Sequence, residues 1–280
     1  MRLRWRTRIL PNLLTYVVLV CITAFCIFPL AWLLLTSLKL ERDIVTPVMQ
    51  YVPHHVTLGN YVTIWTESGF PKLIFNSALT TIYTVAICAT AGALASYSLA
   101  RFAFPGRRFF LLGYLVVRMF PAVLMIIPLF IAMRAIHLLD TRIGLAIAYT
   151  SFLLPLFIWM MLGFFRAAPK ELEDAARIDG CTRVGALLRV VIPVVRNGLA
   201  ATAVFVAISA WNEFIFALML TTSEGSRTWP VGLQLMVGEF QLPWGPLSAG
   251  GIISILPILA LFAIAQRTMV RGIAAGAVKG

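Results

Sequence analysis

The chain is poor in charged residues: only 12% of its 280 residues are Asp, Glu, Lys or Arg, whereas 60% are hydrophobic. Average globular proteins carry roughly 25% charged residues. A soluble domain of this composition could not cover its surface with polar groups, which argues against a cytosolic enzyme, a secreted domain or a disordered chain. The composition is instead typical of a protein whose solvent is the lipid bilayer.

Cysteine and histidine are also scarce. The four cysteines show no spacing typical of a metal or redox motif. The three histidines fall in predicted loops, so no cluster of His, Asp and Glu within the apolar segments supports an enzyme embedded in the membrane. No G-x-x-x-x-G-K-[ST] sequence is present, so we expect no phosphate loop and no ATP hydrolysis in this chain.

Long apolar runs make up most of the remaining sequence. A membrane-spanning helix needs about 20 mostly apolar residues. Six segments meet this requirement and predict an all-α, polytopic membrane protein that forms a single domain over residues 1–280. The predicted spans are residues 12–37, 73–100, 109–133, 143–165, 198–220 and 247–266.

The basic residues are unevenly distributed between the two sides of these spans. The formal net charge is +12, and sixteen of the 23 Lys and Arg residues fall in the N-terminal segment and in residues 101–108, 166–197 and 267–280. Basic residues collect in cytoplasmic loops. We therefore expect both termini to be cytoplasmic, and we interpret the surplus charge as an orientation signal rather than a nucleic-acid footprint.

The cytoplasmic loop 166–197 differs from the rest of the chain, because four of the 11 acidic residues lie within residues 171–179. Pro169 favours the start of a helix, and Gly180 can close that helix. Thr182 can cap a second short helix, which Pro193 is expected to end. The pattern predicts a helix–turn–helix that docks on a cytoplasmic protein. The alternative, a helix resting on lipid head groups, is disfavoured by the acidic residues.

Part of this loop resembles a known motif. Asp174-Ala175-Ala176-x3-Gly180, followed after nine residues by Val190-x-Ile192-Pro193, is similar to the EAA motif of binding-protein-dependent ATP-binding-cassette importers, Glu-Ala-Ala-x3-Gly-x9-Ile-x-Leu-Pro. The three departures, at residues 174, 190 and 192, keep charge or apolar shape. Further stretches resemble the smaller permease subunit of carbohydrate importers of the maltose-transporter type: residues 58–61, 76–77, 100–107, 119–121, 211–214 and 276–280.

The resemblance implies the type I importer permease fold and assigns roles to individual positions. In the loop 166–197, a coupling helix would contact an ATPase subunit through Glu173, Asp174, Ala175, Ala176, Gly180 and Pro193. The C-terminal tail, with Ala277, Val278, Lys279 and Gly280, would reach toward the ATPase subunits. The outer loop 221–246 would face a substrate-binding protein and offers Trp229, Gln234, Glu239 and Gln241 for contact with a sugar.

The resemblance also implies an assembly in the cytoplasmic (inner) membrane of a prokaryote. This chain would pair with a second homologous permease subunit, two ATP-binding subunits and an extracytoplasmic substrate-binding protein. It would contact the lipid bilayer but no nucleic acid. It would bind no cofactor itself, with ATP and Mg held by the ATPase subunits. Carbohydrate is the expected cargo, with glycerol-phosphate derivatives or polyols as the alternative. A secondary transporter is a distant alternative, because one intramembrane carboxylate and no inverted repeat are evident.

Two charged residues lie inside the predicted spans. A charged side chain near the bilayer centre costs at least about 2.5–3.5 kcal/mol on insertion scales. We expect Arg118 to line a polar translocation cavity or a subunit interface, with snorkelling or pairing between helices as the alternative. Glu213 and its neighbour Asn212 are candidates for a hinge, a gate or a substrate contact.

Overall fold

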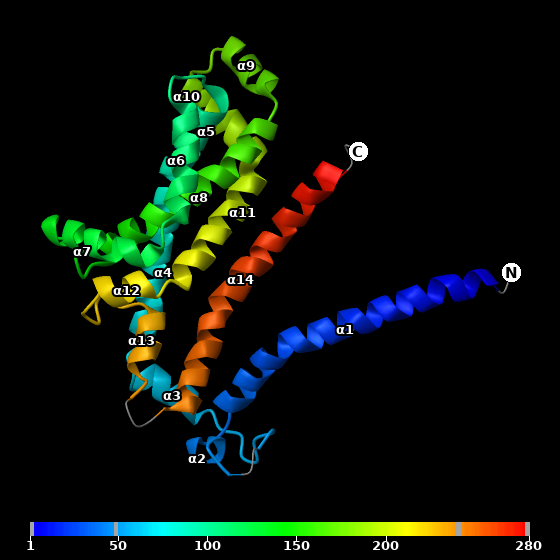
Figure 1. The fold of residues 1–280 in the computed structure, drawn as a ribbon, viewed down its shortest axis with the longest axis vertical. Coiled ribbons are helices and arrows are strands. Elements are labelled where there is room, and N and C mark those ends of the chain that lie inside the picture. The colour runs from blue at the N-terminus through cyan, green and yellow to red at the C-terminus, as the bar shows by residue number, and fades with distance from the viewer. Residues whose placement is uncertain (1–2, 48–49, 239–241, 278–280) are drawn as a thin grey trace. The chain divides into compact units, whose positions relative to one another are not determined.

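The computed structural model describes residues 3–47, 50–238 and 242–277, and within these ranges it contains helices joined by turns and loops (Figure 1). The α-helices are α1 (Leu3–Ser37), α2 (Glu41–Ile44), α3 (Gly59–Thr66), α4 (Phe70–Ile87), α5 (Ala93–Arg101), α6 (Arg107–Met119), α7 (Ile126–Ala135), α8 (Arg142–Ala167), α9 (Lys170–Ile178), α10 (Arg183–Ala186), α11 (Ile192–Trp211), α12 (Ile215–Leu220), α13 (Trp229–Leu235) and α14 (Trp244–Ala277). A 3₁₀ segment, η2 (Ala122–Met125), and two π-helical segments, η1 (Cys88–Gly92) and η3 (Leu187–Val191), connect some of them.

The chain divides into two compact units. The first falls within Met1–Phe70 and Leu235–Ile255, and the second within Pro71–Gln234 and Leu256–Gly280. In the described residues, five helices are long and apolar enough to cross a membrane: Thr15–Ser37, Phe70–Arg101, Arg142–Ala167, Arg183–Trp211 and Trp244–Ala263. The prediction of an all-α, polytopic membrane protein is confirmed.

In the first unit, side-chain hydrogen bonds fix the segment that follows α1. The side-chain amide of Asn60 donates to the backbone carbonyls of Ser37 and Lys39, both at 2.8 Å. The Glu41 carboxylate accepts hydrogen bonds from the backbone N–H groups of the first two residues of α14, each at 2.9 Å. Negative charge at a helix N-terminus is favourable, so Glu41 stabilises the start of α14.

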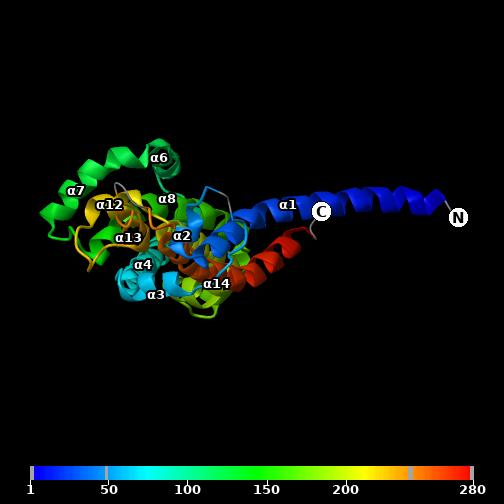
Figure 2. The same ribbon diagram turned by 90° about the horizontal axis from the view of Figure 1, so that it is seen from below.

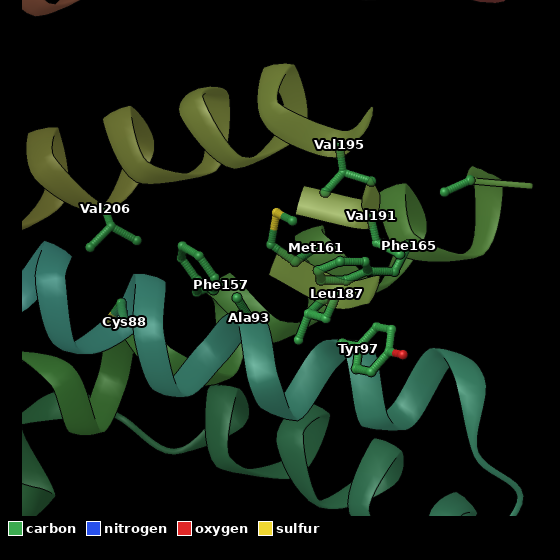
Figure 3. Packing of buried hydrophobic residues seen from close by; sticks show 11 residues of the cluster. Cys88, Ala93, Tyr97, Phe157, Met161, Phe165, Leu187, Val191, Val195 and Val206 are labelled. Carbon is green, nitrogen blue, oxygen red and sulfur yellow. The ribbon is translucent and has the colours of Figure 1, made fainter. Parts of the chain in front are cut away.

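In the second unit, α8 packs against α5, α6 and α11. Apolar side chains from α5, α8, α11 and the two π-helical segments form a buried cluster that includes Tyr97, Phe157 and Phe165 (Figure 3). Because lipid tails are as apolar as these side chains, close packing rather than escape from water holds membrane helices together. Gly198 of α11 permits such packing, since a Cβ atom there would lie 2.3 Å from the ring of Phe164.

The predicted third span, residues 109–133, is not one helix. α6 ends at Met119, and beyond Pro121 the segment η2 leads into α7. α7 runs across the direction of α6 (Figure 2). Proline lacks a backbone donor and disfavours helical geometry in the residue before it. Among the described residues, six predicted spans therefore correspond to five helices of spanning length and one broken segment.

The fifth predicted span, residues 198–220, is also shifted. The helix runs from Arg183 to Trp211, so the prediction that Pro193 ends a short helix is wrong. The π-helical segment η3 lies just before this proline, and the Ile192 N–H bonds to the Leu187 carbonyl, five residues back. The helix is therefore continuous through Pro193, with a wider π-helical turn directly before it. At its other end α11 stops at Trp211, and α12 is a separate helix.

Candidate functional site

The loop that carries the motif folds as a helix and a tight turn at one end of the second unit (Figure 1). α9 begins after Pro169, and Gly180, with φ +90°, follows its end. The Gly180 N–H bonds to the Arg177 carbonyl at 3.2 Å, and the Cys181 N–H bonds to the Ala176 carbonyl at 3.0 Å. This pair of bonds is the Schellman motif, in which glycine is preferred at the left-handed position.

The next helix also starts as the sequence predicts. The Thr182 hydroxyl accepts a hydrogen bond from the Gly185 N–H at 3.1 Å and so caps α10. Glu171 and Glu173 lie in the first turn of α9, where the helix dipole favours negative charge. The turn and both helix starts are therefore encoded locally.

Glu173 points into the protein, toward α5. Its carboxylate accepts a hydrogen bond from the Tyr97 hydroxyl and pairs with Arg101 at an Nε–Oε2 distance of 3.1 Å. Arg101 also donates from Nη2 to the Ala168 carbonyl at 2.9 Å. Only 7% of Glu173 is exposed. Arg101 lies within the matched stretch 100–107, which could have drawn attention to it, whereas no sequence signal marked Tyr97.

The opposite face of the loop is open to solvent. Of the residues predicted to contact an ATPase subunit, Asp174, Ala175, Gly180 and Pro193 are exposed, whereas Glu173 and Ala176 are buried. Two apolar side chains accompany the exposed set, since Leu172 is 45% and Ile178 86% exposed. Exposed apolar patches with a polar rim mark interaction surfaces, so these two side chains favour such a surface on α9.

Asn212 and Glu213 lie between α11 and α12. The Asn212 side-chain amide donates to the Ile208 carbonyl at 2.8 Å, near the end of α11. The Glu213 carboxylate accepts hydrogen bonds from the backbone N–H groups of Phe216 at 2.9 Å and Ala217 at 3.2 Å, at the start of α12. Both side chains therefore satisfy backbone groups at helix ends. These bonds offset part of the cost of placing a carboxylate within an apolar segment.

Two of the predicted sugar-contact residues of the outer loop lie in different surroundings. Trp229 donates its indole N–H to the Trp211 carbonyl at 2.8 Å, so this polar group is already used within the protein. Gln234, by contrast, is exposed on α13. Glu239 and Gln241 lie outside the described residues, as do Val278, Lys279 and Gly280 of the tail. The backbone of Arg118 lies in α6 and that of Ala277 ends α14, but their side chains are outside the described part.

At the end of the second unit opposite α9, Asp140 holds the loop that follows α12. Its Oδ1 accepts hydrogen bonds from the backbone N–H groups of Thr222 at 2.8 Å and Ser223 at 3.0 Å, and from the Ser226 hydroxyl. Burial alone raises the pKa of Asp140, but these hydrogen bonds outweigh it and hold the pKa well below its ordinary value. Sequence reasoning missed this cluster, because its members belong to no motif.

The same loop is held from α4. The Asn76 side-chain amide donates to the backbone carbonyls of Glu224 at 3.0 Å and Arg227 at 2.9 Å. The Ser77 hydroxyl accepts a hydrogen bond from the Trp229 backbone N–H at 2.8 Å. Asn76 and Ser77 are both buried and belong to a stretch that carried the family resemblance. Their place in the structure gives this short stretch a physical role.

The helical unit built on α8 and α11, with an exposed α9 at one end, matches a known class of membrane transporter. The family model for the binding-protein-dependent transport system inner membrane component matches residues 89–274. The chain belongs to this family, and it is therefore a permease subunit of an ATP-binding-cassette importer rather than an enzyme.

Individual relatives match along most of the chain. The sulfoquinovosyl glycerol transport system permease protein of Agrobacterium fabrum is 38% identical, over 91% of this chain and 89% of the relative. The trehalose transport system permease protein of Mycobacterium tuberculosis is 36% identical, over 92% of this chain and 94% of the relative. The predicted permease class is confirmed.

A solved structure matches the fold. It is the crystal structure of a bacterial ABC transporter involved in the import of the acidic polysaccharide alginate, with a TM-score of 0.80. The match covers 94% of this chain and 97% of that chain at 22% sequence identity. At this identity the likeness bears on the fold alone, and it confirms the predicted importer permease fold.

Proposed function

We propose that this chain imports a sugar or sugar derivative as one of two homologous permease subunits driven by two ATP-binding subunits. The support is that relatives at 33–38% identity are named for transport of sulfoquinovosyl glycerol, trehalose or diacetylchitobiose. These cargoes all contain a sugar, which favours sugars over simple polyols. A structural neighbour with a TM-score of 0.68 was solved with a periplasmic protein carrying an alginate pentasaccharide. By analogy, an extracytoplasmic binding protein delivers the cargo.

The exposed face of α9 is the observation on which the coupling role depends. Asp174 and Ala175 present a carboxylate and a small side chain, which allow ionic pairing and close approach to an ATPase subunit. Gly180 sets the turn that orients this face. Because Glu173 and Ala176 are buried, we assign them the positioning of α9 rather than direct contact. Pro193 supports the same loop from the start of α11.

The remaining predicted sites take secondary roles in this proposal. The ATPase subunits bind ATP and Mg, and the tail residues 277–280 contact them on the cytoplasmic side, where both termini lie. Arg118 faces the translocation pathway or the second permease. Asn212 and Glu213 form a hinge between α11 and α12, where their helix-capping bonds must rearrange if the two helices move apart. Gln234, Glu239 and Gln241 face the binding protein, and Trp229 supports their loop.

The experiment is to co-express the chain with its partner subunits and reconstitute the complex. We expect the ATPase subunits to co-purify with the chain. A sugar that binds the binding protein is first identified by thermal shift. The binding protein loaded with this sugar should then stimulate ATP hydrolysis and uptake. Asp174→Lys should abolish the stimulation, whereas Asp174→Glu, which keeps the charge, should retain it. Wild-type coupling in Asp174→Lys would disprove the placement of the coupling surface. Absence of ATPase subunits from the wild-type complex would disprove the importer itself.

A further inference from the structure

One continuous helical stretch, Phe70–Arg101, connects the two ends of the second unit (Figure 1). It comprises α4, η1 and α5 and has 32 residues. At 1.5 Å per residue its length is about 48 Å, enough to cross the hydrocarbon core of a bilayer. Its second part, η1 and α5, packs against α8, and a Cβ atom on Gly92 would lie 2.4 Å from the Phe157 ring. This close packing restrains bending of the part formed by η1 and α5.

The inner end of this stretch is fastened to α9. Tyr97 and Arg101, one turn apart on α5, both bind the Glu173 carboxylate. Arg101 also donates a hydrogen bond to the carbonyl of Ala168, and this residue lies between α8 and α9. Buried charged and hydrogen-bonded groups define one geometry, because any displacement leaves a partner unpaired in a medium of low dielectric constant. α9 therefore cannot move relative to α5 without breaking these bonds.

The outer end of the same stretch is fastened to the loop between α12 and α13. Asn76 and Ser77, on α4, bind the backbone of Glu224, Arg227 and Trp229. The sequence predicts this loop on the side of the membrane where a binding protein docks. The two sets of polar contacts are thus joined by one helix, with a predicted ATPase contact at one end and a predicted binding-protein contact at the other.

We propose that Phe70–Arg101 acts as a rod that transmits movement of α9 to the loop 221–228, with Tyr97, Arg101 and Glu173 as positioning residues at its inner end and Asn76 and Ser77 at its outer end. The inference rests on the proposed function and adds the path by which the state of the ATPase subunits reaches the outer loop. In this proposal Glu173 is buried against α5 because it connects α9 to that helix.

The test follows the outer loop while ATP binds at the other end. In the complete reconstituted transporter, with Cys21, Cys26, Cys88 and Cys181 replaced by alanine, a spin label is attached at Glu224→Cys. The Glu224 side chain is 80% exposed and is paired only at the surface with Lys72, at 3.6 Å. The probe is ATP with Mg and vanadate. We expect the label's mobility to change when the nucleotide is trapped.

Variants at each end should interrupt this response. Glu173→Gln at the inner end and Ser77→Ala at the outer end should each reduce the nucleotide-dependent change by about fivefold, at the lower end of typical coupling between distant sites. Glu171→Gln is the matched control, because Glu171 is an exposed acid on the same helix. It should respond as the wild type does. If Glu173→Gln does not assemble, Tyr97→Phe removes only the hydroxyl and should give a smaller reduction.

Two outcomes would overturn the rod. In the first, the wild-type complex transports but the label at residue 224 does not respond to trapped nucleotide. In the second, assembled variants at both ends respond as the wild type does. If these residues have only a structural role, the variants assemble poorly or unfold at a lower temperature, but the complexes that do assemble respond as the wild type does. This is a case of the second outcome and also contradicts the rod. A wild-type complex without stimulated ATPase activity would instead contradict the proposed function.

Discussion

Three carboxylates that lie partly or fully out of solvent in the described residues serve as acceptors for the protein's own hydrogen-bond donors. Glu173 accepts from the Tyr97 hydroxyl, Asp140 from two backbone N–H groups and the Ser226 hydroxyl, and Glu213 from two backbone N–H groups of α12. Hydrogen bonds to charged groups contribute about 1.5–3 kcal/mol each, and removing one partner leaves the other exposed to the full desolvation cost. Each carboxylate therefore fixes a particular junction between elements.

We predict that Asp140→Asn lowers the free energy of unfolding by about 1–2 kcal/mol near pH 7, because the carboxylate is charged but partly screened by water. The pKa of Asp140 is depressed in the folded state. Its stabilisation is therefore fully present above the ordinary pKa of about 3.9 and is lost as the pH falls through the folded-state value. Thermal unfolding in detergent, followed from about pH 7 to about pH 3, should show the difference between wild type and variant shrinking. A difference independent of pH would contradict the assignment.

For Glu213 the prediction separates helix capping from a transport role. Glu213→Ala removes both acceptors at the start of α12 and should lower stability by about 1–2 kcal/mol, whereas Glu213→Gln keeps an amide oxygen and should cost less. Thermal unfolding and sugar uptake are measured on the same preparations. Uptake that falls only in proportion to folded protein indicates capping alone. A large loss of uptake in a stable Glu213→Gln protein would establish the hinge or gate.

At the scale of elements, proline and glycine set where helices break, but their effect depends on the neighbouring turns. After Pro121 the chain changes direction between α6 and α7, whereas the helix continues through Pro193, which follows a π-helical turn, and α8 continues through Pro155. Gly180 ends α9 because its backbone is left-handed, with φ +90°. The orientation of the coupling surface therefore depends on this glycine.

We predict that Gly180→Ala destabilises the loop by about 1–2 kcal/mol, the cost of a left-handed backbone for a residue with a Cβ atom. Gly180→Asn should cost less, because Asn is enriched in this conformation. Steric overlap is not the cause, since no atom lies within 4 Å of a Cβ at Gly180.

Gly163→Ala is the matched control for this prediction. Gly163 lies inside α8, and its Cβ would also meet no atom within 4 Å. Alanine should therefore be neutral or stabilise the helix by up to about 1 kcal/mol. Thermal unfolding and stimulated ATPase activity are the measurements. Equal effects of Gly180→Ala and Gly163→Ala would show that the left-handed turn is unimportant.

At the scale of the whole molecule, the two ends of the second unit carry different sets of contacts. α9 and the end of α5 meet at one end, and Asp140, Asn76 and the loop 221–228 meet at the other (Figure 1). Residues 101–108 and 166–197, at the first end, carry nine Lys and Arg residues, whereas residues 134–142 and 221–246, at the other end, carry three, and basic residues collect in cytoplasmic loops. The orientation in the membrane thus decides which end meets the ATPase subunits.

We predict opposite accessibility of the two ends in whole cells. In the variant without native cysteines, Glu224→Cys should react with a membrane-impermeant maleimide added outside spheroplasts. Glu171→Cys should react only after the membrane is permeabilised, because we propose that its loop faces the cytoplasm. Both positions are exposed, so the difference reports sidedness rather than burial. Reaction of Glu171→Cys in intact spheroplasts would overturn the orientation and, with it, the coupling role of α9.

The sequence by itself determined the features that depend on neighbouring residues or on composition. Low charge and long apolar runs determined the lipid solvent and the helical class. Pro169, Gly180 and Thr182 determined the ends of α9 and the start of α10, because caps and left-handed turns involve residues only a few positions apart. The spacing of the motif indicated the family for the same reason, since all its members lie within one short segment.

Only the tertiary structure decided which side chains meet across long separations. Glu173 and Tyr97 are 76 residues apart, and their pairing reversed the expected direction of Glu173 within α9. Asp140 and Ser226 are 86 residues apart, and Asn76 reaches Glu224 across 148 residues. Periodicity places a residue on a face of its own helix, but the packing of α5, α8 and α11 decides what that face contacts. A charge in the interior needs a hydrogen-bonding or ionic partner, because an unpaired charge there is too costly, and for Glu173 the packing of the helices supplies that partner.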